Sequence, residues 1–261
     1  MIRRQLLTGL IVMVVMTVAL GFLYPFAVWG ISQIAFHSKA NDSLIKVNGK
    51  VVGSKLLGQN FTDKDGNPLP KYFQPRPSAA GDGYDAMSSS ASNLGPTNPN
   101  LIGNIPGVAI GADGKPITSN PYATPSDPYC VPVQATDTGD NPITDAQGNA
   151  VYEKNKDGSY VCDSNTVPQR VLAYRAFNDL AARTKVPVDA VTSSGSGLDP
   201  DISIANADLQ AARVAKARNL SLDQVMKLVQ QHTHGRSLGF LGEKGVNVLE
   251  LNIALDELQH T

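Results

Sequence analysis

The apolar stretch LLTGLIVMVVMTVALGFLYPF, residues 6–26, decides how this chain is organised. It is the densest part of a run from residue 6 to residue 36 that contains no Asp, Glu, Lys or Arg. A helix of about 20 apolar residues crosses the ~30 Å hydrocarbon layer of a bilayer. Tyr24 and Trp29 lie where an aromatic belt would meet the headgroups, and Pro25 is tolerated near the helix end. The sequence therefore predicts a transmembrane anchor over residues 1–36.

A cleaved signal peptide is the alternative for this run. Its apolar region usually spans about 7–15 residues and precedes a small-residue cleavage site. The run is longer and no A-x-A pattern follows it, which favours an uncleaved anchor. The flanking basic residues are Arg3 and Arg4 at the short end and Lys39, Lys46 and Lys50 on the other side. Long domains translocate largely regardless of their own charge, so we expect a cytoplasmic N-terminus and an extracytoplasmic domain.

Residues 37–261 are enough for one domain of ordinary size with a large insertion, or for two small ones, and one domain is the simpler expectation. All 23 acidic residues and all but Arg3 and Arg4 of the 22 basic ones follow the anchor. That leaves 20 basic against 23 acidic residues, a net charge of −3. Because a basic footprint is missing, we expect no nucleic-acid partner.

Cys130 and Cys162 are the only cysteines, and both lie in a Pro/Gly-rich region. Outside the cytoplasm they are a candidate disulfide, and two unpaired thiols are the alternative. Two cysteines alone cannot form a structural zinc site, and we expect no metal.

The remaining patterns predict an α+β domain. Asn48-Gly49 between β-branched residues predicts a hairpin. Pro75 and Pro77 hold Arg76 in an extended path, where it either ties down carbonyls or faces a partner. Apolar periodicity predicts helices at 171–184, at 204–218 after the cap Ser203, from the capping box of Ser221 and Gln224 to near Gly235, and at 248–258. A short strand is expected at 186–191, and the unhelical residues 101–167 are interpreted as a loop or hairpin insertion.

Sites that bind phosphate or calcium are not supported. Gly114-Lys115 resembles the end of a phosphate loop, but Ala109 and Pro116 replace required residues. The loop 194–197 could form an anion nest, yet Asp199 and Asp201 stand beside it and would repel an anion. A calcium loop starting at Asp63 fails because Pro68 and Gln74 occupy its glycine and glutamate positions.

Catalytic patterns are equally weak. Ser43 and Lys46 have the spacing of a serine/lysine nucleophile pair, but Ser43 is expected on a strand of the hairpin. His232 and His234, two residues apart, should face different sides near a helix end. The sequence therefore predicts no catalytic residue.

Six blocks together resemble one family. They are NGKVVGSKLLGQNF at 48–61, FQPRPSAAG at 73–81, SNLGPTNP at 92–99, SGSGLDPDIS at 194–203, RVAKARNLS at 213–221 and LGEKGVNVLELNIALD at 241–256. In this order behind one anchor, they resemble the KdpC family, the C subunit of the Kdp high-affinity potassium-transporting P-type ATPase. Residues 101–167, with both cysteines, depart from the family as a large insertion.

The resemblance implies a non-catalytic accessory subunit in the bacterial inner membrane. Its partners would be a channel-like potassium-translocating subunit, a P-type ATPase subunit and a small membrane peptide. The family is described as a catalytic chaperone that raises the ATP affinity of the hydrolysing subunit. Direct ATP contact conflicts with a periplasmic domain, so ATP enters only as a family attribute and no bound cofactor is expected.

The candidate partner-contact residues come from two of these blocks. They are Phe73, Gln74, Arg76, Pro77, Ser78, Ser194, Gly195, Ser196, Gly197, Leu198 and Asp199. Two alternatives of another class stay open: a membrane-anchored periplasmic hydrolase that uses Ser43 and Lys46, or an anion-binding module built on residues 194–197.

Overall fold

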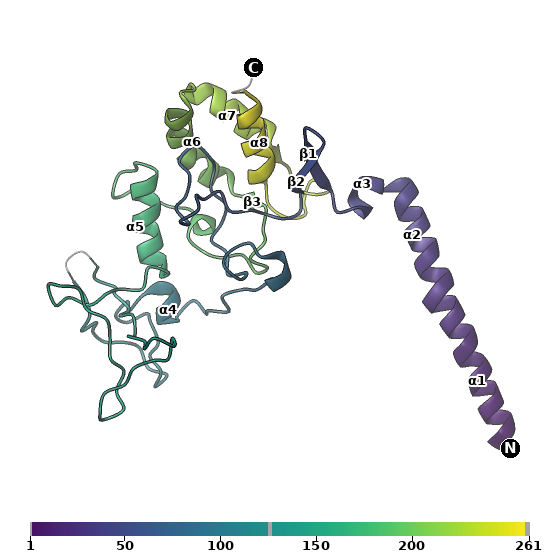
Figure 1. Cartoon of the computed structure of the whole chain (residues 1–261), viewed down its shortest axis with the longest axis horizontal. Coiled ribbons are helices and arrows are strands. Elements are labelled where there is room, and N and C mark those ends of the chain that lie inside the picture. The colour runs from purple at the N-terminus through teal and green to yellow at the C-terminus, as the bar shows by residue number, and fades with distance from the viewer. Residues whose placement is uncertain (1, 125–126, 259–261) are drawn as a thin grey trace. The chain divides into compact units, whose positions relative to one another are not determined.

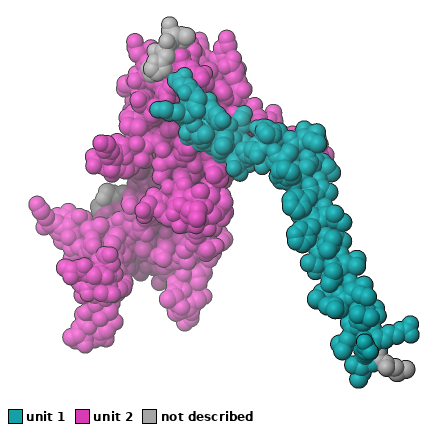
Figure 2. Space-filling model, turned by 45° about the vertical axis from the view of Figure 1, so that its right-hand side comes forward, with its two compact units in different colours: residues 1–56 teal, residues 57–261 magenta. Residues whose placement is uncertain are grey.

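The computed structural model describes residues 2–124 and 127–258. The chain divides into two compact units, Met1–Leu56 and Leu57–Thr261, coloured separately in Figure 2. The division falls after a hairpin that follows the expected anchor.

The first unit begins with one long helix, Ile2–Ala35, which is long and apolar enough to cross a membrane. It consists of α1 (Ile2–Val18), a π-helical turn η1 (Ala19–Leu23) and α2 (Tyr24–Ala35). Pro25 has no N–H for the carbonyl four residues before it, and at the adjoining turn the Tyr24 N–H bonds the carbonyl of Ala19 instead. The predicted apolar helix is therefore present, and the π-helical turn η1 accommodates Pro25 within it.

A hairpin follows the short helix α3 (His37–Ala40). Strands β1 (Leu44–Val47) and β2 (Lys50–Ser54) pair antiparallel, with an irregularity between Ile45 and Lys46. Asn48 and Gly49 both have positive φ, 50° and 78°, as a tight two-residue turn requires. The predicted Asn-Gly hairpin is confirmed.

The core of the second unit packs three helices on a small sheet (Figure 1). The helices are α6 (Ile204–Arg218), α7 (Leu222–Gln231) and α8 (Val248–Leu258). The sheet has the order β3-β5-β4, all antiparallel, from β3 (Asp201–Ile202), β4 (Thr233–His234) and β5 (Gly245–Asn247). The shared core consists of Phe73, Ile202, Ala207, Ala211, Val214, Ala215, Val225, Val229, Val246, Val248, Leu251 and Leu255. This mixture of helix and sheet confirms the α+β class.

Two of the predicted helices, 204–218 and 248–258, have the expected bounds. The capping box of Ser221 and Gln224 is also present. The helix it starts was expected to reach Gly235 but ends at Gln231, because the next residues form β4 and pair with β5. Tertiary pairing therefore shortened this helix.

Two other expectations were wrong. The helix expected at 171–184 is α5 (Val167–Phe177), which starts with a proline in its first turn and ends before Asp179, a residue with φ 55°. The strand expected at 186–191 is a short 3-10 turn, η3 (Val188–Ala190). The carboxylate of Asp189 in this turn accepts hydrogen bonds from the backbone N–H and hydroxyl of Ser203 at 2.8 Å, which fixes the start of α6.

The chain before α5 contains two short elements, η2 (Ala86–Ser88) and α4 (Pro99–Ile102). From α4 to α5 it is mostly turns. Bridges six residues apart close small hairpins: Ile110 with Pro116, Thr136 with Pro142, Thr144 with Ala150 and Lys154 with Tyr160. A disulfide joins Cys130 and Cys162, whose Cα atoms are 5.2 Å apart. The turns are therefore held by backbone bridges and a disulfide.

Candidate functional site

The extended segment at residues 70–76 is the first part of the candidate site. Its prolines prevent helix formation, and its peptide groups are bonded by side chains. The Phe73 N–H donates to Asn252 Oδ1 at 2.9 Å, and Asn252 Nδ2 donates to the Phe73 carbonyl at 3.0 Å. Gln74 and Gln210 form a similar reciprocal pair at 2.7 and 3.0 Å. Helices α6 and α8 thus hold this segment as a neighbouring strand would.

Two buried arginines of α6 donate hydrogen bonds to the same segment. Arg218 donates to the Lys71 carbonyl at 2.6 Å and to Asp256 at 2.8 Å. Arg213 donates to the carbonyls of Pro70 and Tyr72, and its guanidinium lies 4.3 Å from the ring centre of Phe177. Burial lowers the pKa of Arg213 to about 10. Both arginines therefore bind backbone carbonyls and are not exposed to solvent.

Arg76, the last residue of the segment, faces the second group of candidate partner-contact residues, 194–199. Its Nη1 lies 3.0 Å from Asp199 Oδ2, and its Nη2 donates to the Ser193 carbonyl at 3.3 Å. The Tyr84 hydroxyl donates to the Arg76 carbonyl at 2.9 Å. Burial, assisted by the charge of Asp199, raises the pKa of Tyr84. Within the described residues the Arg76 Nε is buried and has no hydrogen-bond partner.

Ser78 and Gly197 bring the two blocks into direct contact. The Ser78 hydroxyl donates to the Gly197 carbonyl at 2.6 Å and accepts from the backbone N–H of Ala80 and of Tyr84. Gly197 has φ 69°, and a Cβ there would lie 2.7 Å from the Ser90 carbonyl and 2.8 Å from Ala80. Only glycine combines this backbone with so close an approach.

The loop 194–197 uses its own polar groups internally. The Gly197 N–H donates to the Ser194 carbonyl, and the Leu198 N–H donates to the Ser196 hydroxyl. The Ser196 carbonyl accepts from the backbone of Ser90 at 3.1 Å. Gly195 has open space beside it. With the Asp199 carboxylate next to these groups, the loop is arranged as a structural turn.

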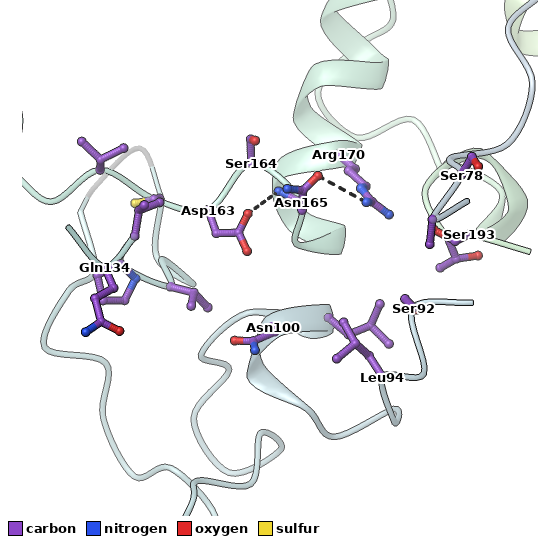
Figure 3. A pocket seen from close by; sticks show the side chains of 18 residues that line it. Ser78, Ser92, Leu94, Asn100, Gln134, Asp163, Ser164, Asn165, Arg170 and Ser193 are labelled. Carbon is purple, nitrogen blue, oxygen red and sulfur yellow. Dashed lines mark hydrogen bonds between the residues drawn. The ribbon is translucent and has the colours of Figure 1, made fainter. Parts of the chain in front are cut away.

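Two hollows border the joined blocks. The smaller, about 500 Å³, is lined by Gln74, Arg76, Pro77, Arg170 and Tyr174 among others. The larger, about 950 Å³, lies between Ser78, Leu94 and Ser193 on one side and the segments around Gln134 and Asp163 on the other (Figure 3).

Arg170 lines both hollows. It donates to the Val191 carbonyl at 3.2 Å and to Asn165 Oδ1 at 3.4 Å, and the second bond is drawn in Figure 3. Burial lowers its pKa, and the charge of Asp163 opposes that shift. The walls thus offer guanidinium, amide and hydroxyl groups.

The weak catalytic and ligand patterns remain apart from this site. Ser43 is buried with φ 48° in the turn before β1, whereas Lys46 is exposed. His234 Nε2 of β4 lies 2.8 Å from Asp201 Oδ2 of β3, across Gly245 of the central strand β5. The Asp63 carboxylate accepts the N–H groups of Asp65 and Asn67. These placements leave Ser43 without a shared face with Lys46 and engage Asp63 in its own turn.

One group has metal-ligand spacing in the described part of the chain, Asp127 with Cys130 and Cys162. Both sulfur atoms belong to the disulfide and cannot bind as thiolates. The Asp127 carboxylate accepts a hydrogen bond from Gln169. This group is therefore structural.

Several residues that build the site were not identified from the sequence. They are Tyr84, Gln210, Arg213, Arg218 and Asn252. A signal existed for Arg218, which lies four residues after the inward-facing Val214 and so continues the buried stripe of α6.

Comparison with known proteins shows what the chain is similar to. The family model for KdpC, the K⁺-transporting ATPase c chain, matches residues 6–127 and 144–257. The KdpC subunit of the potassium-transporting ATPase of Mycobacterium tuberculosis (strain H37Rv) is 44% identical over 98% of this chain and 100% of that protein. The corresponding subunit of Koribacter versatilis is 36% identical over 98% of this chain and 96% of its own. Within the matched span, the family model omits only residues 128–143, a narrower segment than the 101–167 expected.

Proposed function

Because this chain belongs to the KdpC family of K⁺-transporting ATPase c chains, we propose that it is the non-catalytic accessory subunit of an ATP-driven potassium-import complex. The single observation that carries this function is the family match along almost the whole chain. A membrane-anchored hydrolase or a dedicated anion-binding module is not proposed.

We propose that the partly exposed residues of the joined blocks, Gln74 to Ser78 with Gly195, Ser196 and Asp199, form the surface that contacts a partner subunit. The other expected contact residues, Phe73, Ser194, Gly197 and Leu198, are buried and support this surface from within. Arg76 and Arg170 line the smaller hollow with polar neighbours, and the Arg76 side chain is 22% exposed beside Asp199. A rigid wall of this kind suits a carbonyl or carboxylate of another polypeptide. The proposed partners are the channel-like potassium-translocating subunit, the P-type ATPase subunit and the small membrane peptide.

We further propose a single-pass orientation in the bacterial inner membrane, with the N-terminus cytoplasmic and the following domain periplasmic. The support is Arg3 and Arg4 at the short end of the helix Ile2–Ala35. In this orientation, a chaperone effect on ATP affinity acts through the partner subunits and not by contact with ATP.

Protease treatment of intact spheroplasts tests the orientation. The domain after Phe36 should be digested from outside while a cytoplasmic marker protein stays protected. Protection of the domain until the membrane is lysed would reverse the orientation and restore direct ATP contact.

Co-purification tests the function itself. The tagged full-length chain, expressed with the other Kdp subunits, should leave detergent-solubilised membranes with the large subunits and with potassium-stimulated ATPase activity. A monomer that leaves the membrane alone and hydrolyses a substrate would refute the proposal.

A further inference from the structure

Beyond β4 and β5, the chain forms an exposed hairpin tip, residues 236–243. Ser237 and Leu241 form an isolated bridge with two backbone hydrogen bonds of 2.9 Å, beyond the last pair of the sheet, His234 with Gly245. Every residue from 234 to 244 is exposed. The tip is therefore an exposed turn that lies beyond the ends of β4 and β5.

The hairpin tip carries large apolar side chains. Leu238 is 82% exposed, Phe240 69% and Leu241 50%. Single exposed apolar residues are common on protein surfaces, whereas three within four positions at one tip form a patch. Such a patch is typical of a contact surface, because removing its apolar side chains from water against a partner is favourable.

The backbone of the hairpin tip also contains one residue in an unfavourable conformation. Leu238 has φ 53°, in the left-handed region that a residue with a β-carbon rarely adopts. Among the other described residues, the non-glycine positions with positive φ are mostly asparagine and aspartate, and the two exceptions are Ser43 and Tyr84. Asparagine or glycine would suit this turn better, so the leucine serves something other than local folding.

An ion pair joins the first and last residues of the hairpin tip. Arg236 Nη2 lies 2.9 and 2.8 Å from the two carboxylate oxygens of Glu243, so the two charges neutralise one another. Among residues 236–244, Lys244 is the one further charged group. The apolar side chains are therefore presented on a preformed and nearly neutral support.

We propose that the hairpin tip inserts Leu238 and Phe240 into an apolar recess on the extramembrane surface of another protein subunit of the complex. This inference rests on the proposed function, since it requires a subunit partner. A bilayer surface is the less favoured occupant, because so small an apolar tip needs several basic residues to hold anionic lipid. A protein recess accepts a neutral tip without burying an unpaired charge, and an aromatic anchor there is a typical hot spot.

Paired measurements on variants of the full-length chain, expressed with the other subunits, test the proposal. Leu238→Asn and Phe240→Ser should each lower the amount of large subunit retained after detergent extraction on the order of ten-fold. Leu238→Asn should at the same time keep or raise the thermal midpoint of the chain, because it relieves the left-handed leucine. Val188→Ser, at a residue that is 73% exposed in η3, is the matched control and should change neither quantity.

Photo-crosslinking in native membranes identifies the occupant. The chain with Phe240→p-benzoylphenylalanine should form an adduct with a partner subunit. Adducts with lipid alone or with a second copy of the chain would overturn the proposal, and so would full retention of the complex in both tip variants. If the unaltered chain itself fails to co-purify, the proposed function fails, while the crosslink still decides what the hairpin tip touches.

Discussion

Nη1 of Arg76 lies 3.0 Å from Oδ2 of Asp199, although 123 residues separate them in the chain. This contact joins the two blocks that the family resemblance had marked separately. Tyr84 strengthens the junction, because its hydroxyl bonds the Arg76 carbonyl and lies 3.4 Å from the carbonyl of Asp199. The candidate surface is therefore one rigid unit and not two independent loops.

Removing one partner of this pair should destabilise the second unit. Arg76→Ala leaves the partly buried Asp199 carboxylate unpaired, and we expect a loss of about 1–3 kcal/mol in the free energy of unfolding. The midpoint of urea unfolding measures it. Lys216→Ala is the control, since Lys216 lies 4.0 Å from Asp179 in an exposed pair and should cost less than about 1 kcal/mol. Equal losses in the two variants would show that the Arg76 pair is not special.

Two glycines of the same loop provide a second comparison. Gly197→Ala places a Cβ against the Ser90 carbonyl and forces an alanine to φ 69°, so we expect a loss of about 2 kcal/mol or more. Gly195→Ala meets nothing within 4 Å and should be close to neutral. Thermal unfolding of both variants measures the difference. If Gly197→Ala is tolerated as well as Gly195→Ala, the close approach to Ala80 does not hold in solution.

Tyr84 should make the site sensitive to alkali. Burial raises its pKa above the usual value of 10.0, so the unfolded chain releases the phenolic proton first. The stability linked to Tyr84 is therefore fully present below about pH 10 and is lost as pH rises towards the folded pKa. Tyr84→Phe removes this dependence, so its unfolding free energy should fall less between pH 9 and 11 than that of the unaltered chain. Parallel pH profiles would assign the alkaline loss to other tyrosines.

The contacts of the site show which features the sequence could predict. Helix α6 was predictable because its signals are local: Ser203 caps it, and Ala207, Ala211 and Val214 repeat at helical spacing. The end of α5 was missed because the chain turns directly after it: Asp179 has φ 55°, and Arg175 donates to the Thr184 carbonyl nine residues further on. Local periodicity carries no information on that bond.

The arginines of α6 illustrate the same limit at the site. Charged residues on a helix are usually expected on its solvated face. Arg213 and Arg218 are buried because the carbonyls of Pro70, Lys71 and Tyr72 meet them, and those acceptors lie more than a hundred residues earlier. The prolines predicted that the segment is extended, but nothing in the sequence predicted which side chains bind its carbonyls.

A charge in the middle of the apolar helix should prevent insertion. Val14→Asp or Val15→Arg places a charge near the bilayer centre, which costs about 2.5–3.5 kcal/mol on insertion scales. The fraction of chain that resists carbonate extraction from membranes should fall accordingly. Phe36→Asn, beyond the end of α2, is the control and should have little effect. Equal effects at both depths would argue that the helix does not span the bilayer.

The disulfide should stabilise the turn-rich segment and leave the helical core unaffected. It closes a loop with a sequence separation of 32 residues, for which chain entropy predicts about 3–4 kcal/mol. The Cys130 carbonyl also accepts hydrogen bonds from the side-chain amides of Asn104 and Asn120, so the disulfide is tied to the turns that precede it in the chain. In the double variant Cys130→Ser with Cys162→Ser, hydrogen exchange should become faster at residues 104–163, whereas α8 should keep its protection because its contacts lie with α7 and β5. Unchanged exchange at residues 104–163 would show that side-chain bonds alone hold the turns, and faster exchange in α8 would show that the two regions unfold together.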